Sequence, residues 1–280
     1  MDSRTQNASL RNILSEDLGA GDVTMAFTPE RRIRAQVVSK GRGFISGLLE
    51  ARHLFRLYGV QAKTKLRDGD RIKKGSIAIS LEGSSRKIFS LSRSALNILS
   101  RMSGVTTLTR NYVQKVEKTH PHARIMATRK TTPLFRYFEK KAVKVGGGLT
   151  HRMGLYDMIL IKHDHLAMFP GGIPEALRAA KKSRIGGKVE IEVENVSDAV
   201  LAAKSKADVI MLDNMPPKEI KKVIYLLNSY GLRGKVKIEV SGGINIKNIS
   251  GYAKCGVDFI SVGGLTHSPP SIDFHLRVVD

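Results

Sequence analysis

The C-terminal third of the chain alternates apolar runs with amphipathic segments at a regular interval, and this alternation limits the fold more than any other feature. Four β-branched, apolar runs have the length of buried strands, at 189–194, 208–213, 236–241 and 258–263. Between them, 197–204, 217–230 and 245–255 carry apolar residues three and four positions apart, as amphipathic helices do. Strands that alternate with helices form a parallel sheet with right-handed crossovers. The pattern therefore predicts an α/β fold.

Two further runs, 124–127 and 158–161, extend this series upstream to six strands. A series of this kind either closes into a barrel or spreads into an open doubly wound sheet. In both folds the ligand site lies at the carboxyl ends of the strands. Six strands favour a small barrel, so we predict a TIM-like α/β barrel in this part of the chain.

The first hundred or so residues follow a different pattern. Short strands are predicted at 35–45 and 77–81, and Asp68-Gly69-Asp70 is typical of the turn in an antiparallel hairpin. A helix is predicted at 50–58. A second helix is predicted at 91–102, ended by Gly104 at a C-cap position. These elements indicate a separate α+β domain at the N-terminus.

Composition excludes several classes of protein. Cys255 is the only cysteine among 280 residues, so a disulfide scaffold and a cysteine-only metal site are both excluded. No apolar run approaches the roughly 20 residues that cross a bilayer, and residues 1–10 lack the pattern of a secretory signal. We expect a cytoplasmic protein with no membrane partner.

The chain is strongly basic, with 47 Lys and Arg against 25 Asp and Glu, a formal net charge of +22. Such a charge is compatible with binding to nucleic acid, to an acidic membrane surface or to small polyanions. Many lysines occur in separated pairs rather than in long blocks of one sign, which indicates solvated helix faces and turns. Charge alone therefore leaves the kind of partner open.

Acidic residues lie at the ends of two neighbouring predicted strands. Glu190, Glu192 and Glu194 alternate onto one face of the first, and Asp213 ends the next. A carboxylate inside a barrel is unfavourable unless it is paired, hydrogen-bonded or bound to a metal. These acids therefore either serve the chemistry of a site or pair with Lys130 or Lys162, and the two roles are compatible.

The exits of the last two strands are rich in glycine. Ser241-Gly242-Gly243 and Gly263-Gly264 would let backbone N–H groups approach an anion, which predicts a phosphate site. His267 follows the second pair; it either reaches the same pocket or serves as a packed or capping residue. Because glycine pairs also occur in ordinary turns, the prediction of a phosphate site depends on their position at adjacent strand exits.

Cations follow the upstream strands. Arg129, Lys130, Arg152 and Lys162 would meet at one mouth of the barrel, and four positive charges there require an anionic ligand. A phosphorylated sugar beside a carboxylic acid would suit the cations, the acids and the glycine turns together. The run 162–165 also has the His-x-His spacing of a metal site, but its lysine opposes a cation and a third ligand is missing.

Seven motifs, in order along residues 14–273, resemble the quinolinate phosphoribosyltransferase family. They are 15–24 (SEDLGAGDVT), 94–97 (SALN), 128–133 (TRKTTP), 146–148 (GGG) with His151-Arg152, 212–214 (LDN), 241–243 (SGG) and 266–268 (THS). The resemblance implies an N-terminal α+β sandwich domain at 1–103, on which the tail 268–280 packs, and an α/β barrel at 104–267. It also implies a homodimer, or a hexamer of dimers, in which Arg93 reaches the neighbouring subunit's site.

The reaction implied by the resemblance joins quinolinate to phosphoribosyl pyrophosphate and releases pyrophosphate and CO₂, giving nicotinate mononucleotide. Lys130, Lys162, Glu192 and Asp213 are the implied catalytic residues. Glu192 and Asp213 would also face, indirectly, the Mg²⁺ ion that is bound to phosphoribosyl pyrophosphate. The implied substrate-binding residues are Arg93, Thr128, Arg129, Lys130, His151, Arg152, Lys162, Ser241, Gly242, Gly243, Gly263, Gly264 and His267.

Two positions depart from the family pattern. Lys162-His163-Asp164-His165 replaces the usual Lys-Asp-Asn-His, and Gly264 stands where alanine is usual. Alternatives are a phosphoribosyltransferase acting on nicotinate or another aromatic acid, and a basic nucleic-acid-binding protein. A related protein encoded with molybdate transporters shares the fold, but the complete TRKTTP and SGG segments favour the transferase.

Overall fold

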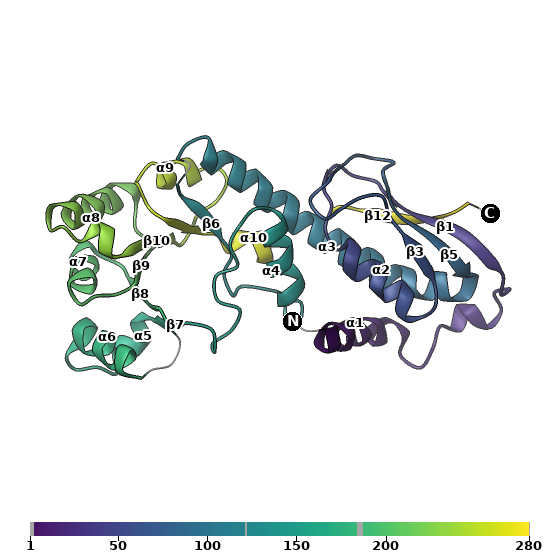
Figure 1. The fold of residues 1–280 in the computed structure, drawn as a ribbon, viewed down its shortest axis with the longest axis horizontal. Helices are drawn as coiled ribbons and strands as arrows, with labels where there is room; N and C mark the ends of the chain where they lie inside the picture. Colours follow the sequence, from purple (N-terminus) through teal and green to yellow (C-terminus); the bar gives the residue numbers. More distant parts are fainter. Residues whose placement is uncertain (1–2, 121, 184–186, 280) are drawn as a thin grey trace. The chain divides into compact units, whose positions relative to one another are not determined.

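The computed structural model describes residues 3–120, 122–183 and 187–279, which form two compact units (Figure 1). The first unit comprises residues up to Leu108, Thr131–Gly146 and the segment from Ser268. The second comprises Thr109–Lys130 and Gly147–His267. No helix in the described ranges is both long and apolar enough to cross a membrane.

The second unit is built on six parallel strands in the order β6-β11-β10-β9-β8-β7. The strands are β6 (Arg124–Met126), β7 (Ile159–Ile161), β8 (Val189–Val193), β9 (Val209–Asp213), β10 (Lys237–Ser241) and β11 (Phe259–Ser261). Each lies within a run that the sequence predicts as a strand. The expectation of a barrel-like sheet of six parallel strands is confirmed.

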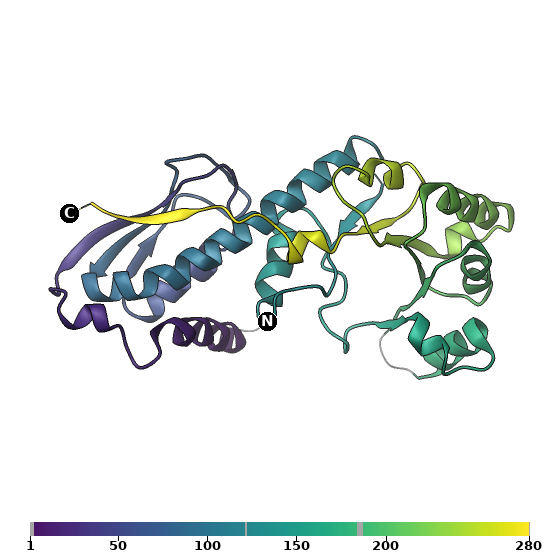
Figure 2. The same cartoon turned by 180° about the vertical axis from the view of Figure 1, so that it is seen from behind.

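Helices of the second unit follow the strands in alternation. They are α5 (His163–Leu166), α6 (Gly172–Lys182), α7 (Val196–Lys204), α8 (Pro217–Ser229), α9 (Ile249–Ala253) and α10 (Gly264–His267), with a 3-10 turn η2 (Arg233–Lys235). Helices α6, α7 and α8 lie side by side along the outside of the sheet (Figures 1 and 2). Because helices cover one face and the strands enclose the other, β8 is buried at Val189, Glu190, Ile191 and Val193.

Helix α9 is shorter than the predicted segment 245–255. The side chain of Asn248 accepts a hydrogen bond from the N–H of Asn245 at 2.8 Å, and that of Asn245 accepts from the N–H of Lys247 at 2.9 Å. These local bonds form a turn that replaces the first helical turn. The helix therefore begins only at Ile249.

The first unit contains a four-stranded antiparallel sheet in the order β12-β1-β5-β3 and a two-stranded pair of β2 and β4. Its strands are β1 (Arg32–Ser39), β2 (Gly43–Phe44), β3 (Gln61–Lys63), β4 (Arg71–Ile72), β5 (Ile77–Ser84) and β12 (Phe274–Val278). Its helices are α1 (Ser3–Leu18), η1 (Val23–Ala26), α2 (Leu48–Leu57), α4 (Arg136–Val145) and most of α3 (Ser85–Glu117). The C-terminal strand β12 pairs antiparallel with β1, with Val37 opposite Leu276.

The prediction that Gly104 ends the helix beginning at Leu91 is wrong. Helix α3 has 33 residues and continues past Gly104 to Glu117. A Cβ at position 104 would lie 2.3 Å from the carbonyl oxygen of Pro270, so glycine here permits close packing rather than a helix end. The signal is ambiguous in sequence because both roles select the same residue.

Residues 131–146 pack within the first unit, whereas the predicted boundaries assign them to the barrel domain. The carboxylate of Glu139 is fully buried and accepts bonds from Arg101 Nε at 2.9 Å and Nη2 at 2.7 Å. Thr106 Oγ1 donates to the carbonyl of Ala142 at 2.9 Å. A buried charge must keep its partner, so these contacts hold α4 against α3.

Asp258 links the amino ends of β10 and β11, and we expect Asp258→Asn to lower the free energy of unfolding at pH 7 by about 2 kcal/mol. Its carboxylate accepts bonds from Arg233 Nη2 at 2.8 Å, Lys237 Nζ at 2.8 Å and the N–H of Ile238 at 2.9 Å. Partial burial alone would raise the pKa of Asp258, but the bonds from Lys237 and Ile238 and the charge of Arg233 hold it below its ordinary value.

A lowered folded-state pKa means that this stabilisation is present at pH values above the unfolded pKa, which is about 4. It is lost as the pH falls through the folded pKa. Urea unfolding of the wild type and Asp258→Asn should therefore show a difference in the free energy of unfolding at pH 7. That difference should shrink in acid, as the carboxylate of Asp258 becomes protonated. Asp273→Asn is the control, because its pair with Lys40 at 3.1 Å is exposed. Equal losses in the two variants would contradict the prediction.

Candidate active site

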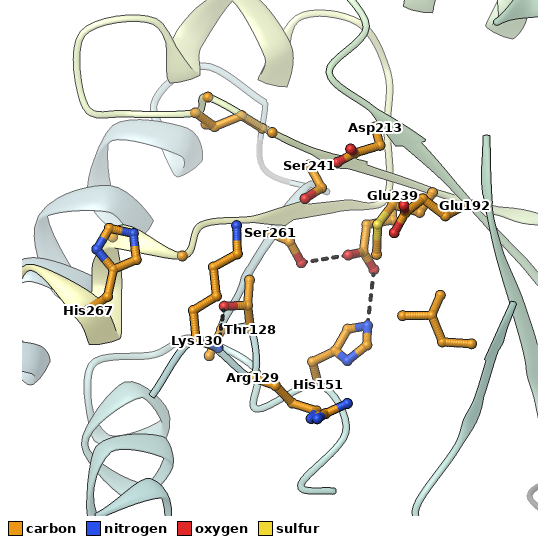
Figure 3. Close-up of a pocket in the computed structure, with 18 of the residues that line it drawn as sticks. Thr128, Arg129, Lys130, His151, Glu192, Asp213, Glu239, Ser241, Ser261 and His267 are labelled. Atoms are coloured by element: carbon orange, nitrogen blue, oxygen red, sulfur yellow. Dashed lines mark hydrogen bonds and ion pairs between the residues drawn. The ribbon is translucent and has the colours of Figure 1, made fainter. Parts of the chain in front are cut away.

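A single pocket of about 680 Å³ opens at the carboxyl ends of the six strands (Figure 3). It brings together every predicted site residue of the second unit. These residues are Thr128, Arg129, Lys130, His151, Arg152, Lys162, Glu192, Asp213, Ser241, Gly242, Gly243, Gly263, Gly264 and His267. The parallel sheet explains the gathering, because it directs the ends of all its strands to one edge.

Arg93 is the predicted site residue outside this pocket. It is exposed on α3, within the first unit. Its predicted role involves a neighbouring subunit, and a single chain contains no such neighbour. The role of Arg93 therefore stays a prediction.

The acids of the pocket are held by neighbouring polar groups. Lys162 Nζ lies 3.0 Å from Glu192 Oε2, so the pairing with a pocket lysine that the sequence left open does occur. Asn214 Nδ2 donates to Asp213 Oδ2 at 2.7 Å. Glu194 is exposed beyond the end of β8. The site therefore presents two oriented carboxylates, of which one is already matched by a lysine.

The turn after β10 has a backbone that favours glycine. Gly242 and Gly243 have φ angles of +91° and +59°. The N–H of Asn214 donates to the carbonyl of Ser241 at 2.9 Å, and a Cβ on Gly242 would lie 2.2 Å from Asn214 Oδ1. The missing side chain at Gly242 thus lets the strand exits of β9 and β10 approach each other closely.

A side chain in the turn after β11 would crowd two pocket side chains. A Cβ on Gly263 would lie 3.2 Å from Lys130 Cδ and 3.3 Å from the ring of His267. Thr266 Oγ1 donates to the carbonyl of Lys130 at 2.8 Å, and Thr128 Oγ1 accepts from the N–H of Lys130 at 3.1 Å. The backbone of Lys130 is therefore fixed by two hydrogen bonds. Its side chain lies next to Gly263 and lines the pocket (Figure 3).

Arg152 is nearly buried, with 8% of its surface exposed. Burial and the charge of Arg129 lower the pKa of Arg152, and the nearby carboxylate of Glu190 partly offsets them. Arg129 and Arg152 line the same pocket with like charges, so an anion bound between them would be favoured. This agrees with the predicted anionic ligand.

Four polar residues in and beside the pocket form a buried cluster. His151 Nε2 lies 3.0 Å from Glu190 Oε2. It also lies 3.6 Å from Glu239 Oε2, and Ser261 Oγ donates to Glu239 Oε1 at 2.6 Å (Figure 3). Burial, followed by the charge of Glu190, raises the pKa of Glu239 well above its ordinary value.

Sequence reasoning missed Glu239, Ser261 and Asn214 as separate contributors to the site. A signal was present for two of them, since Glu239 lies two positions before Ser241 in one strand, and Ser261 two positions before Gly263 in the next. Residues two apart in a strand point to the same face. The backbone φ of +53° at Asn214 and its contact with Asp213 carry no comparable pattern.

The run 162–165 keeps its link to the pocket despite the altered residues. Lys162 lines the pocket, and its N–H donates to His165 Nδ1 at 2.9 Å, which closes the first turn of α5. The substituted pair, His163 and Asp164, is exposed. Among the described residues, the only group of three with ligand atoms close enough for a metal ion is His151, Glu190 and Glu239, which excludes this run.

Comparison with known proteins agrees with the motifs. The sequence profile described as quinolinate phosphoribosyl transferase, N-terminal domain, matches residues 22–103, and the C-terminal domain profile matches 105–277. A probable nicotinate-nucleotide pyrophosphorylase [carboxylating] of Archaeoglobus fulgidus is 42% identical over 92% of this chain and 98% of its own length. One of Bacillus subtilis is 37% identical over 96% of this chain and 92% of its own length.

Solved structures show the same architecture. The nicotinate-nucleotide pyrophosphorylase from Francisella tularensis has a TM-score of 0.90 and 33% identity, covering 100% of this chain and 98% of that one. Human nicotinic acid phosphoribosyltransferase has a TM-score of 0.63 and 11% identity, covering 98% of this chain and 74% of that one, which shows a common fold alone. On both profiles and these relatives, the chain belongs to the quinolinate phosphoribosyltransferase family.

Proposed function

We propose that this chain transfers the phosphoribosyl group of phosphoribosyl pyrophosphate to quinolinate, with release of pyrophosphate and CO₂, and so makes nicotinate mononucleotide in NAD biosynthesis. The observation that supports this most directly is the convergence of four cations, two carboxylates and two glycine turns on one pocket. Membership of the family, whose matched relatives bear the name of this activity, agrees with it.

The cations would bind the two carboxylates of the pyridine acid and the phosphates of the donor. Arg152 and Arg129 both line the pocket, and their planar groups suit the two parallel bonds of a carboxylate. Lys130 and Lys162 line the same pocket. The turns Ser241-Gly242-Gly243 and Gly263-Gly264 would admit phosphate oxygens, with Thr128 and His267 at the rim of that part.

The carboxylates would face the ribose. Displacement of pyrophosphate places positive charge on the reacting ribose carbon as its bond to the leaving oxygen breaks, and Glu192 and Asp213 would stabilise that charge. The ring nitrogen of quinolinate supplies the electron pair for the new bond, so no residue need act as a covalent nucleophile. The cation clamp would hold the nitrogen in line with this carbon.

Loss of CO₂ follows once the nitrogen is bonded to ribose and positively charged. The bond between the ring and the 2-carboxylate breaks, its electron pair stays on the ring carbon, and a proton replaces the carboxylate. The residues therefore need to orient the acid without locking the departing carboxylate. A partly paired lysine such as Lys162 suits that requirement, because Glu192 shares its charge.

Glu192 and Asp213 fit the needs of Mg²⁺, since this ion keeps several waters and takes one or two protein carboxylates together with substrate phosphates. Asp213 Oδ1 is left for such a contact while Oδ2 accepts from Asn214. When bound, the ion would neutralise charge on the pyrophosphate. We propose further that the enzyme is cytoplasmic and works as a homodimer or hexamer, with Arg93 completing the neighbouring site.

The test combines purified protein, quinolinate, phosphoribosyl pyrophosphate and Mg²⁺ and measures CO₂ and the nucleotide. We expect both products in equal amounts with quinolinate, and much slower turnover with nicotinate, which has one carboxylate fewer for the arginine pair. Turnover of nicotinate alone would replace the proposal with the alternative acid. Tight, salt-sensitive binding of nucleic acid without turnover of either acid would favour the nucleic-acid-binding alternative.

A further inference from the structure

Both ring nitrogens of His151 are engaged within the protein. The backbone N–H of Arg152 donates to Nδ1 at 2.7 Å, so Nδ1 acts as an acceptor. The proton of the neutral ring then sits on Nε2, which donates to Glu190 Oε2 at 3.0 Å. Although His151 lines the pocket, it has no ring nitrogen left for a ligand while these bonds persist.

The backbone at His151 is in the left-handed region, with a φ of +51°. This conformation is unfavourable for a residue with a side chain unless surrounding contacts maintain it. The bonds of the ring to Glu190 and to the next N–H are such contacts. They determine the direction in which the chain leaves His151 and enters Arg152.

Glu190 is fully buried and does not line the pocket. Its Oε1, like Oε2 of Glu239, has no hydrogen-bond partner among the described residues. Burying a carboxylate with an oxygen that lacks a hydrogen-bond partner is unfavourable, so the contacts that Glu190 does make are needed to stabilise its charge. Those contacts are the ring of His151, the nearby positive charge of Arg152 and the neighbouring carboxyl of Glu239.

A metal ion between His151, Glu190 and Glu239 is the competing interpretation, since their ligand atoms lie within 4.8 Å of one another. A metal would need the lone pair of Nε2, which moves the ring proton to Nδ1. The N–H of Arg152 would then face another N–H instead of an acceptor. The hydrogen bond at 2.7 Å therefore favours a purely protein-bonded cluster.

We propose that Glu190 is a positioning residue that acts through His151 to hold Arg152 in the geometry needed to bind a carboxylate of the pyridine acid. Ser261 holds Glu239, whose carboxyl lies beside Glu190 and 3.6 Å from the ring of His151. This inference rests on the proposed function for the identity of the acid. The placement of Arg152 by His151 and Glu190 is independent of that identity.

Three variants separate the connection through the ring from the charge of Glu190. Glu190→Ala removes both, Glu190→Gln keeps an acceptor for Nε2 without the charge, and His151→Asn keeps a residue that tolerates positive φ but removes the ring. Glu194→Gln is the matched control, since Glu194 lies just beyond the same strand and is exposed.

We expect Glu190→Ala and His151→Asn each to raise the KM for quinolinate at least about tenfold, with the KM for phosphoribosyl pyrophosphate changed less than about twofold. Glu190→Gln should recover most of the loss, and Glu194→Gln should match the wild type. The double variant of Glu190→Ala with His151→Asn should be no worse than either single variant, because both break the same connection.

A second measurement is independent of turnover. Crystal structures of Glu190→Ala and His151→Asn should show the guanidinium of Arg152 displaced from its place 3.4 Å from the carbonyl of Met158. An unmoved Arg152, or equal impairment of Glu190→Gln and Glu190→Ala with an unaffected His151→Asn, would overturn the inference. If the wild type does not use quinolinate but Arg152 is displaced in both variants, the proposed function is wrong and the positioning role of Glu190 still holds. Stoichiometric binding of Zn²⁺ or Mn²⁺ by the wild type that is lost in Glu239→Gln would also overturn the inference about Glu190, in favour of a metal site.

Discussion

Lys162→Ala is expected to reduce kcat/KM for quinolinate about 1,000-fold, because it removes one of the pocket cations that we propose to face the reacting groups. Lys162 lines the pocket at the exit of β7 and holds Glu192 at 3.0 Å. Without its partner, Glu192 would add unmatched negative charge beside anionic substrates. The variant thus loses an attraction and gains a repulsion at the same point.

The fold should tolerate this change. The lysine side chain is 46% exposed, so the pair contributes at most about 1 kcal/mol to the free energy of unfolding. Lys181→Ala is a suitable control, since its side chain is 39% exposed and lies 3.8 Å from Asp208, on α6 outside the pocket. Steady-state kinetics and urea unfolding of the two variants should separate catalysis from stability. A Lys162→Ala protein with more than about a tenth of the wild-type activity would contradict the assignment.

Gly242→Ala is expected to abolish detectable turnover and to lower the free energy of unfolding by about 3 kcal/mol. The new Cβ would lie 2.2 Å from Asn214 Oδ1 and 2.8 Å from the backbone nitrogen of Asn214. A flexible side chain would move aside, but a backbone atom in a strand exit would not. The turn after β10 would be displaced together with Asp213, which Asn214 contacts at 2.7 Å.

The neighbouring glycine provides a matched control. Gly243 also has a positive φ, but a Cβ there would meet no atom within 4 Å. Gly243→Ala should therefore cost only about 1 kcal/mol, the ordinary penalty for a left-handed conformation. Denaturant unfolding and binding of phosphoribosyl pyrophosphate by calorimetry give the two readouts. If both alanine variants behaved alike, close approach of Asn214 would not be the reason for glycine at position 242.

Much of the site could be predicted because its residues follow strands. Lys162, Asp213 and Ser241 come directly after or at the end of apolar runs, and Lys130 comes a few positions after one. Parallel strands direct such positions to one edge. The periodic pattern of the chain was therefore enough to place them together. The motifs of the family added the kind of ligand, which periodicity does not specify.

Other features depend on contacts between residues far apart in the chain. From the sequence, Gly104 is predicted to end a helix, and only its close approach to Pro270 shows the packing role. Residues 131–146 are predicted to belong to the barrel, and only the bond between Glu139 and Arg101 places them in the first unit. The tautomer of His151 follows only from the positions of Glu190 and the N–H of Arg152. Local sequence patterns contain no information about contacts between residues so far apart in the chain.

The sequence by itself determined the alternation of strands and helices, the edge of the sheet where polar residues gather, and the family. Side-chain period and chain direction are properties of local sequence, so they can be read directly. Only the tertiary structure decided which buried charges are matched, why particular glycines are required and which pocket residues turn their polar atoms inward. Those properties depend on close packing and burial, which arise when distant segments meet.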